Sequence, residues 1–152
     1  MHIPDGEPYK RPESVLVVVY TATGKVLLLR RVDHADFWQS VTGSMNRDEV
    51  DPYHTAIREL REETGIVVNG NLVDLEIANR YEIFPEWRYR YEPGVTHNTE
   101  HAFSLKLADI CDVVINPAEH SDACWLSFEE ATRRLASWTN REVVEYIDRN
   151  GL

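Results

Sequence analysis

Apolar and β-branched residues come in short runs along the first part of the chain. Residues 15–20 and 25–31 are two such runs, separated by four residues that end in Gly24. Short apolar runs joined by a glycine-containing turn predict a β-hairpin. We therefore expect two antiparallel strands near the start, after an extended, proline-rich lead-in over residues 1–13.

A helical pattern follows in the middle of the chain. Asp51 is a suitable N-cap, Pro52 suits the first helical position, and Gly65 suits the C-terminal cap. These signals predict one helix of about a dozen residues between Asp51 and Gly65.

The remaining β-type segments are short and flank this helix. They cover residues 38–42, 66–68, 72–77, 80–84, 101–107 and 113–115. Strands, one helix, more strands and C-terminal helices predict an α/β fold with a mixed sheet of the α+β kind. A chain of 152 residues fits a single domain, which we expect over residues 14–152.

Two capping boxes predict the C-terminal helices. Ser127 pairs with Glu130, and Thr139 pairs with Glu142. Each box precedes an amphipathic run, so helices are expected over residues 128–137 and 140–149.

The charge of the chain limits the classes of partner. A net charge of −10 and a pI near 5.0 argue against nucleic acid, whose binding depends on Lys and Arg contacts to phosphate. A small anionic substrate fits an acidic protein if divalent metal ions bridge carboxylates and phosphates. The sequence has no apolar run of about 20 residues and no signal peptide pattern, which predicts no membrane partner and a cytoplasmic location.

The central helix carries a cluster of carboxylates. Glu59, Glu62 and Glu63 stand at i, i+3 and i+4, which places them on one helix face. Like charges at i and i+4 destabilise a helix, and a hard cation such as Mg²⁺, or Mn²⁺ in its place, would relieve the repulsion. The alternative is a solvated face with an ordinary pair between Arg58 and Glu62.

The same stretch resembles the sequence motif of the Nudix hydrolase family. The matching residues are Gly43, Glu49, Arg58, Glu59, Leu60, Glu62, Glu63, Gly65 and Ile66. The resemblance implies the Nudix α/β/α sandwich and metal-dependent hydrolysis of a phosphate anhydride. Eight residues, 50–57, stand where the family has seven, so we expect Glu49 to be displaced or its bracing role to pass to Asp48 or Asp51.

Segments outside the motif resemble the bacterial dihydroneopterin triphosphate diphosphatases of folate biosynthesis. They cover residues 9–20, 36–44, 90–100, 119–126 and 137–142. The resemblance implies cleavage of dihydroneopterin triphosphate into the monophosphate and pyrophosphate by water. It also implies that Glu59 and Glu63 bind metal, that Glu119 is a third ligand or lies beside the water, and that Glu62 binds a second metal.

Cationic and aromatic residues are candidates for substrate binding. Arg30, Arg31, Arg88 and Arg90 could hold a triphosphate, and Trp38, Trp87, Tyr89 and Tyr91 could stack on a flat ring. Their alternatives are surface strand arginines and sheet packing. Asn98, Thr99 and Glu100 offer groups that could read the edge of a pterin.

Two other functions remain open at this point. A pocket for a pterin resembles a pocket for a purine, so the substrate could be a nucleoside triphosphate, including a damaged one. A Nudix-fold module that only binds a ligand or a protein is the third alternative, because a fold does not fix a function. The expected partner is a small-molecule triphosphate, with no particular oligomeric state.

Overall fold

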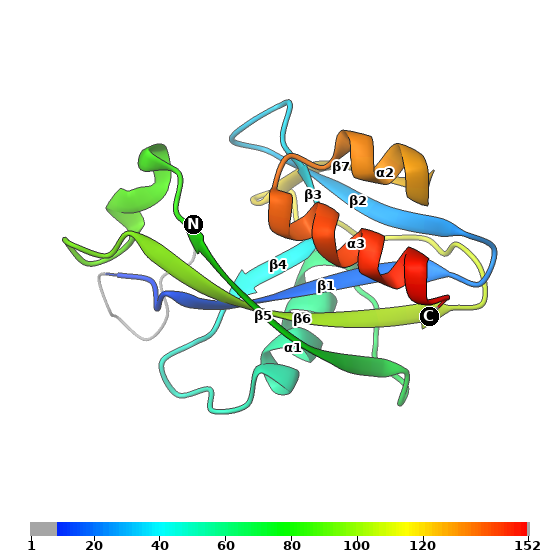
Figure 1. The fold of residues 1–152 in the computed structure, drawn as a ribbon, viewed down its shortest axis with the longest axis horizontal. Coiled ribbons are helices and arrows are strands. Elements are labelled where there is room, and N and C mark those ends of the chain that lie inside the picture. The colour runs from blue at the N-terminus through cyan, green and yellow to red at the C-terminus, as the bar shows by residue number, and fades with distance from the viewer. Residues whose placement is uncertain (1–8, 152) are drawn as a thin grey trace.

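A mixed sheet of seven strands forms the centre of the fold in the computed structural model, which describes residues 9–151 (Figure 1). The strands are β1 (Glu13–Thr21), β2 (Lys25–Arg31), β3 (Trp38–Gln39), β4 (Val41–Ser44), β5 (Leu72–Glu82), β6 (His97–Leu107) and β7 (His120–Ser127). The helices are α1 (Pro52–Thr64), the 3₁₀ helix η2 (Pro85–Arg90), α2 (Phe128–Arg134) and α3 (Trp138–Asn150). The predicted hairpin is confirmed, because β1 pairs with β2 in antiparallel fashion.

The order of strands places β1 at the centre of the sheet. The main path is β3-β2-β1-β6-β5, while β4 pairs with β1 and β7 pairs with β2. The β1 and β6 strands are parallel, and the other pairs are antiparallel. Because β1 pairs with β4 at residues 14–17 and with β2 only at Tyr20, near its end, the sheet opens at the end where Gly43 and Ser44 lie.

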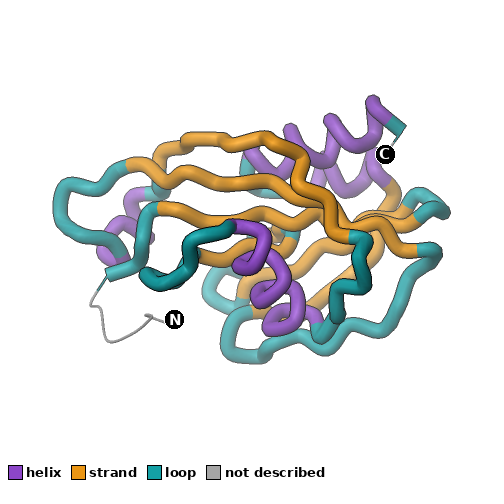
Figure 2. Tube along the Cα trace, turned by 90° about the horizontal axis from the view of Figure 1, so that it is seen from below, coloured by secondary structure: helices purple, strands orange, loops and turns teal. Residues whose placement is uncertain are grey.

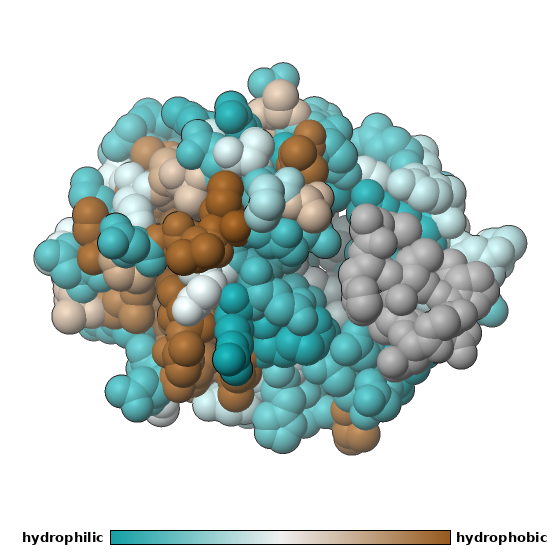
Figure 3. Space-filling model, turned by 180° about the vertical axis from the view of Figure 1, so that it is seen from behind, coloured by the Kyte–Doolittle hydropathy of each residue, from teal (hydrophilic) through white to brown (hydrophobic). Residues whose placement is uncertain are grey.

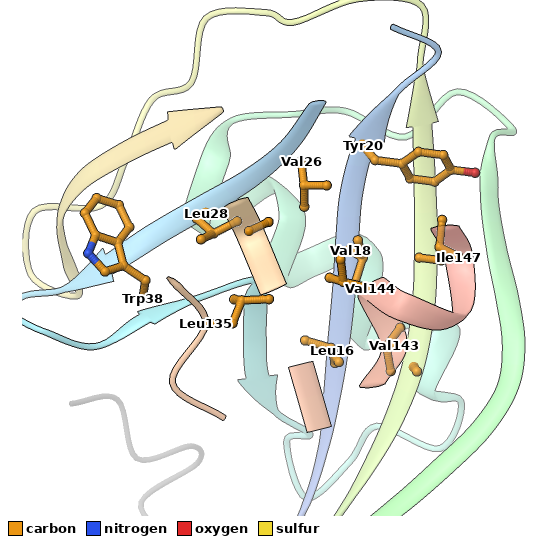
Figure 4. Packing of buried hydrophobic residues seen from close by; sticks show 12 residues of the cluster. Leu16, Val18, Tyr20, Val26, Leu28, Trp38, Leu135, Val143, Val144 and Ile147 are labelled. Atoms are coloured by element: carbon orange, nitrogen blue, oxygen red, sulfur yellow. The ribbon is translucent and has the colours of Figure 1, made fainter. Parts of the chain in front are cut away.

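Helices cover both faces of the sheet, which confirms the predicted α/β/α sandwich (Figure 2). On one face Ala56 and Leu60 of α1 pack on alternate residues of β1 and on Phe103. On the other face Val143, Val144 and Ile147 of α3 contact the opposite side chains of β1 (Figure 4). Successive side chains of β1 point to opposite faces of the sheet, so this one strand contributes to two apolar cores.

The central helix has the caps that the sequence predicts. The Asp51 side chain accepts a hydrogen bond from the Tyr53 N–H at 3.0 Å, and Pro52 occupies the first turn. Gly65 ends the helix with φ +75°, in the left-handed region that favours glycine. The helix is therefore fixed at both ends, and with it the three glutamates.

Several predicted strands are wrong or have other bounds. Residues 66–68 and 113–115 form no strand, because their apolar side chains instead cover the α1 core from loops. The two predicted strands over 72–84 are one strand, β5, with an irregular register between Asp74 and Ile77. The β7 strand was not predicted, since its buried first residue, His120, is followed by the polar and exposed Ser121 and Asp122.

The two capping boxes have different outcomes. Ser127 accepts from the Glu130 N–H at 3.2 Å and begins α2, as predicted. The box of Thr139 and Glu142 is wrong, because α3 begins at Trp138 after Ser137 and Thr139 is buried inside the first turn.

The predicted domain bounds stay a prediction, and residues 1–8 of the lead-in lie outside the described residues. From the side opposite α3, the surface is largely hydrophilic, with many of the hydrophobic residues in a band left of the centre and others scattered (Figure 3). Among the helices of residues 9–151, none has the length and apolar character that crossing a membrane requires.

Candidate active site

The glutamates of α1 line a cleft at the open end of the sheet. Glu59, Glu62 and Glu63 face it together with Glu119, which comes from the loop before β7. The cleft has a volume of about 500 Å³. The structure therefore brings together all four predicted carboxylates, although Glu119 is far from the others in sequence.

Arg58 connects the carboxylates of this region. Its Nη2 lies 2.8 Å from Glu49 Oε1, and its Nη1 lies 2.8 Å from Glu59 Oε1 and 3.1 Å from Glu62 Oε2. Nη2 also donates to the Ser44 carbonyl at 3.0 Å. One guanidinium thus joins α1, β4 and the loop between them.

The expected displacement of Glu49 is wrong. Glu49 Oε1 accepts from the Asn46 N–H at 2.7 Å as well as from Arg58, so Glu49 itself braces the loop. Asp48 is exposed and Asp51 caps the helix. Val50, between Glu49 and Asp51, is 91% exposed, and the longer segment from Glu49 to Arg58 leaves the contact between these two residues intact.

Glu59 lies directly against the backbone of Gly43. A Cβ built on Gly43 would overlap the Glu59 carboxylate. Burial raises the pKa of Glu59 to about 8, and the neighbouring Glu63 and Glu62 also raise it while Arg58 lowers it. Gly43 is therefore needed for close approach of a carboxylate to the strand.

Glu63 lies beside a buried histidine. His120 Nδ1 is 2.6 Å from Glu63 Oε2, but neither atom has hydrogen-bond geometry with any partner among residues 9–151. The other ring nitrogen, Nε2, lies 3.1 Å from Gln39 Nε2. Since the Gln39 amide nitrogen only donates, His120 Nε2 accepts and Nδ1 carries the proton toward Glu63.

The four glutamates are near one another without forming a closed metal site. Within residues 9–151, no three His, Cys, Asp or Glu side chains converge on one point at metal-binding distance. The Arg58 guanidinium lies among these carboxylates, where it forms ion pairs with Glu59 and Glu62. The chemistry of the donors nevertheless fits a hard cation, because Glu63 Oε2 is buried without a hydrogen bond and Gly43 leaves room for the Glu59 carboxylate.

A second, smaller cavity of about 100 Å³ adjoins the cleft. Seven residues line both the cleft and the second cavity: Lys10, Arg31, Gln39, Thr42, Gly43, Ser44 and Arg90. The outer wall of the second cavity is aromatic, with Phe37, Phe84 and Trp87 in edge-to-face contact at centroid distances of 5.3 to 6.0 Å. The cleft thus leads from carboxylates through cations to an aromatic cavity.

The cations at the junction are held in place. Arg90 Nη2 lies 3.2 Å from Asp33 Oδ2, and Arg31 pairs with the same carboxylate at 2.8 Å. The Arg31 guanidinium also lies 4.4 Å from the centre of the Trp87 ring. Burial, followed by the charges of Arg90 and Arg31, lowers the pKa of Lys10 to about 8.

Comparison with known proteins agrees with this arrangement. The family model of the NUDIX domain matches residues 10–147. The chain belongs to the Nudix family. Members of this family generally use divalent metal ions.

Two curated relatives of this Nudix chain carry the same name. Dihydroneopterin triphosphate diphosphatase of Haemophilus influenzae is 43% identical over 141 residues, which cover 90% of this chain and 87% of the relative. The protein of that name from Escherichia coli K12 is 44% identical, with 90% and 92% covered. The solved structure of the E. coli dihydroneopterin triphosphate pyrophosphohydrolase superposes with a TM-score of 0.88 at 42% identity, covering 95% of this chain and 99% of that one.

Five predicted substrate contacts need correction, because the residues lie outside both cavities of the Nudix site: Arg30, Trp38, Arg88, Tyr89 and Thr99. Arg30 stacks on Trp38 at 5.6 Å and donates to Ser121 Oγ. Trp38 is buried in the α3 core, beside Leu28 and Leu135 (Figure 4). Arg88 donates to the Ile83 carbonyl and pairs with Glu82.

The other predicted contacts do lie at the Nudix site. Arg90 lines both cavities, and Asn98 lines the aromatic one. Lys10 and His120 were not predicted. Lys10 stands in a segment of the diphosphatase resemblance, and His120 directly follows Glu119, so position beside matched residues was the signal that could have identified them.

Proposed function

We propose that this chain hydrolyses dihydroneopterin triphosphate to dihydroneopterin monophosphate and pyrophosphate, with Mg²⁺ as its metal. The names of the two curated relatives, at 43% and 44% identity over 90% of the chain, support this substrate. The proposal includes metal binding by Glu59, Glu62, Glu63 and Glu119, with Mn²⁺ as an alternative ion.

One observation carries the proposal, namely the order of chemical groups along the joined cavities. Carboxylates lie at one end, Lys10, Arg31 and Arg90 at the junction, and aromatic rings at the other end. A ring with a triphosphate tail has the complementary order. Its ring would lie among the aromatics, and its tail would cross the cations to reach the carboxylates.

The metal would be held by oxygen ligands of the cleft. Bound there, Mg²⁺ would neutralise phosphate oxygens and lower the pKa of a coordinated water. Mg²⁺ prefers carboxylate oxygens as protein ligands and keeps several of its waters. Four side chains supply carboxylates in the cleft: Glu59, Glu62, Glu63 and Glu119.

The residues of the chain have separate tasks in this proposal. Arg31 and Arg90 hold the tail, and their shared contact with Asp33 fixes the positions of both guanidinium groups before substrate arrives. Glu62 and Glu119 are the carboxylates we propose to orient the attacking water or take its proton. His120 Nδ1 lies 2.6 Å from Glu63 Oε2, and in this proposal His120 holds that carboxylate in position beside the cleft.

The test is a substrate panel with product analysis at a fixed Mg²⁺ concentration. It compares dihydroneopterin triphosphate with GTP, ATP and 8-oxo-dGTP, and separates pyrophosphate from orthophosphate by ion chromatography. We expect pyrophosphate and a monophosphate, with the highest kcat/KM for the pterin. A higher kcat/KM for a nucleotide would make the chain a nucleoside triphosphate pyrophosphatase.

The same panel distinguishes the remaining outcomes. Release of orthophosphate and a diphosphate would overturn the proposed position of the triphosphate tail. No cleavage of any triphosphate, together with retained ligand binding, would identify a binding module. Glu129→Gln, on an exposed turn of α2, is the matched control for variants of the site glutamates.

A further inference from the structure

Two polar side chains of β6 are buried in the wall of the aromatic cavity. Asn98 is 2% exposed and Glu100 is 4% exposed, and both line that cavity. They stand at i and i+2 on a strand, so their side chains leave the same face of the sheet. Two buried polar groups thus line a space that five aromatic side chains also line, namely Phe37, Tyr81, Phe84, Trp87 and Tyr91.

Within the part of the chain that the structure describes, each of these side chains has an acceptor atom without a hydrogen-bond partner. The Asn98 amide nitrogen donates to Ser14 Oγ at 2.7 Å and to the Tyr81 hydroxyl at 3.1 Å, which leaves Oδ1 without a hydrogen bond. Glu100 Oε1 is also buried without a hydrogen bond. Buried acceptors that lack donors are rare, because each costs free energy.

Among the described residues 9–151, no cation compensates the charge of the Glu100 carboxylate. Burial is the main reason that its pKa is raised to about 7, and a hydrogen bond with Thr139 acts in the opposite direction. Lys10, Arg31 and Arg90 line the same cavity but do not contribute to this shift. The group is therefore built to meet donors that arrive with a ligand.

Two acceptors on one wall require two donors on one edge of the ligand. A 2-amino-4-oxo ring presents a ring N–H and an exocyclic NH₂ side by side, as pterins and guanine do. Hypoxanthine lacks the amino group, and adenine presents an acceptor beside its amino group. The acceptors therefore discriminate among flat rings that the aromatic walls alone would accept.

We propose that Asn98 and Glu100 are specificity-determining residues that select rings with a 2-amino-4-oxo edge. This inference rests on the proposed function, because it assigns the ring of the triphosphate to the aromatic cavity. It goes further in naming the edge that is read and the two residues that read it.

The test measures binding of nucleoside monophosphates, which have no anhydride bond to cleave. Isothermal titration calorimetry gives the dissociation constants of GMP, IMP and AMP for the full chain with Mg²⁺. We expect GMP to bind at least about tenfold more tightly than IMP and AMP. GMP and IMP differ only in the 2-amino group, so their ratio isolates that contact.

The decisive variant is Glu100→Gln, which keeps the shape and replaces one acceptor by a donor. We expect it to reduce the ratio of the GMP and IMP affinities to within about threefold. Glu82→Gln is the matched control, because it removes a carboxylate from the neighbouring β5 outside the cavity and should leave the ratio unchanged. Thermal unfolding checks that both variants fold.

Three results would overturn the inference. They are equal binding of GMP and IMP by the unaltered chain, no measurable binding of GMP, and an unchanged ratio in Glu100→Gln. The first two need no variant, so a failure of Glu100→Gln to fold does not leave the question open. Failure of the proposed function is a separate result, since it would appear as absent pyrophosphate release while the preference for GMP persists.

Discussion

The Glu49 carboxylate accepts hydrogen bonds from two nitrogens of the Arg58 guanidinium, Nη2 at 2.8 Å and Nε at 3.1 Å. This paired contact joins the loop before α1 to the helix that carries the three site glutamates. It also lowers the pKa of Glu49, although burial acts in the opposite direction. Because both side chains are mostly buried, the pair should contribute more than a surface ion pair.

The first prediction concerns the stability that this pair provides. Glu49→Ala should lower the free energy of unfolding by about 1 to 3 kcal/mol, because Arg58 and the Asn46 N–H lose their acceptor. Glu62→Ala removes another partner of Arg58, but that side chain is 53% exposed, so the loss should stay below about 1 kcal/mol. Urea denaturation measures both, and equal losses would contradict the bracing role of Glu49.

The sequence predicted the parts of this molecule that local chemistry determines. The caps at Asp51 and Gly65 fixed α1, and the spacing of Glu59 and Glu63 fixed the face they share. Sequence could not show that Val50 turns into solvent and lets Glu49 keep its contact, since that depends on how the loop closes.

Long-range contacts explain most of the site residues that were misplaced or missed. Trp38 has an aromatic ring that could stack on a substrate, but the pairing of β3 with β2 directs its side chain to the core beneath α3. Glu100 was only one of three polar candidates until β6 was seen to place it in the aromatic cavity. The loop segments 66–68 and 113–115 have apolar runs like those of strands, because buried loops and buried strands both need apolar side chains.

The second prediction tests the contact between Gly43 and Glu59. Gly43→Ala should lower the free energy of unfolding by about 1 to 3 kcal/mol, since the new methyl group must push Glu59 away from Arg58. In a Glu59→Ala background the same change should cost less than about 1 kcal/mol, because the obstructing carboxylate is gone. Additive losses in the double-mutant cycle would show that Gly43 is needed for another reason.

The third prediction separates two of the glutamates from the fold. Glu63→Gln and Glu119→Gln should each lower kcat for dihydroneopterin triphosphate by at least about tenfold, the loss expected when a barrier rises by 1.4 kcal/mol or more. Steady-state pyrophosphate release measures kcat, with Glu129→Gln as the unaffected control. A rate within twofold of the parent, in a folded variant, would remove that residue from the proposed metal site.

The fourth prediction concerns the charge of Lys10. Its pKa of about 8 means that the free enzyme loses this cation as pH rises through 8, so kcat/KM for the triphosphate should fall there. Lys10→Arg stays protonated over the same range, so its profile should lack that part of the decline. Profiles from pH 7 to 9.5 at fixed Mg²⁺ make the comparison. Identical slopes would show that Lys10 does not bind the tail.

The last prediction follows from the buried carboxyl of Glu100 in the chain without ligand or metal. Its pKa is raised from 4.5 to about 7, so the folded state binds a proton that the unfolded state releases between those pH values. The contribution of Glu100 to stability is therefore complete below pH 4.5 and is lost as pH rises through 7.

Glu100→Gln cannot titrate, so it should remove this pH dependence. Relative to the variant, the parent should lose on the order of 1 to 3 kcal/mol of unfolding free energy between pH 5 and pH 8. Urea denaturation with EDTA measures the difference, in which the titration of Glu59 and of other groups common to both proteins cancels. A parallel pair of curves would mean that Glu100 is ionised over the whole range, as a carboxylate with a permanent donor would be. The unpaired Oε1 argues for the sloping difference, because only a ligand is proposed to supply the missing donor.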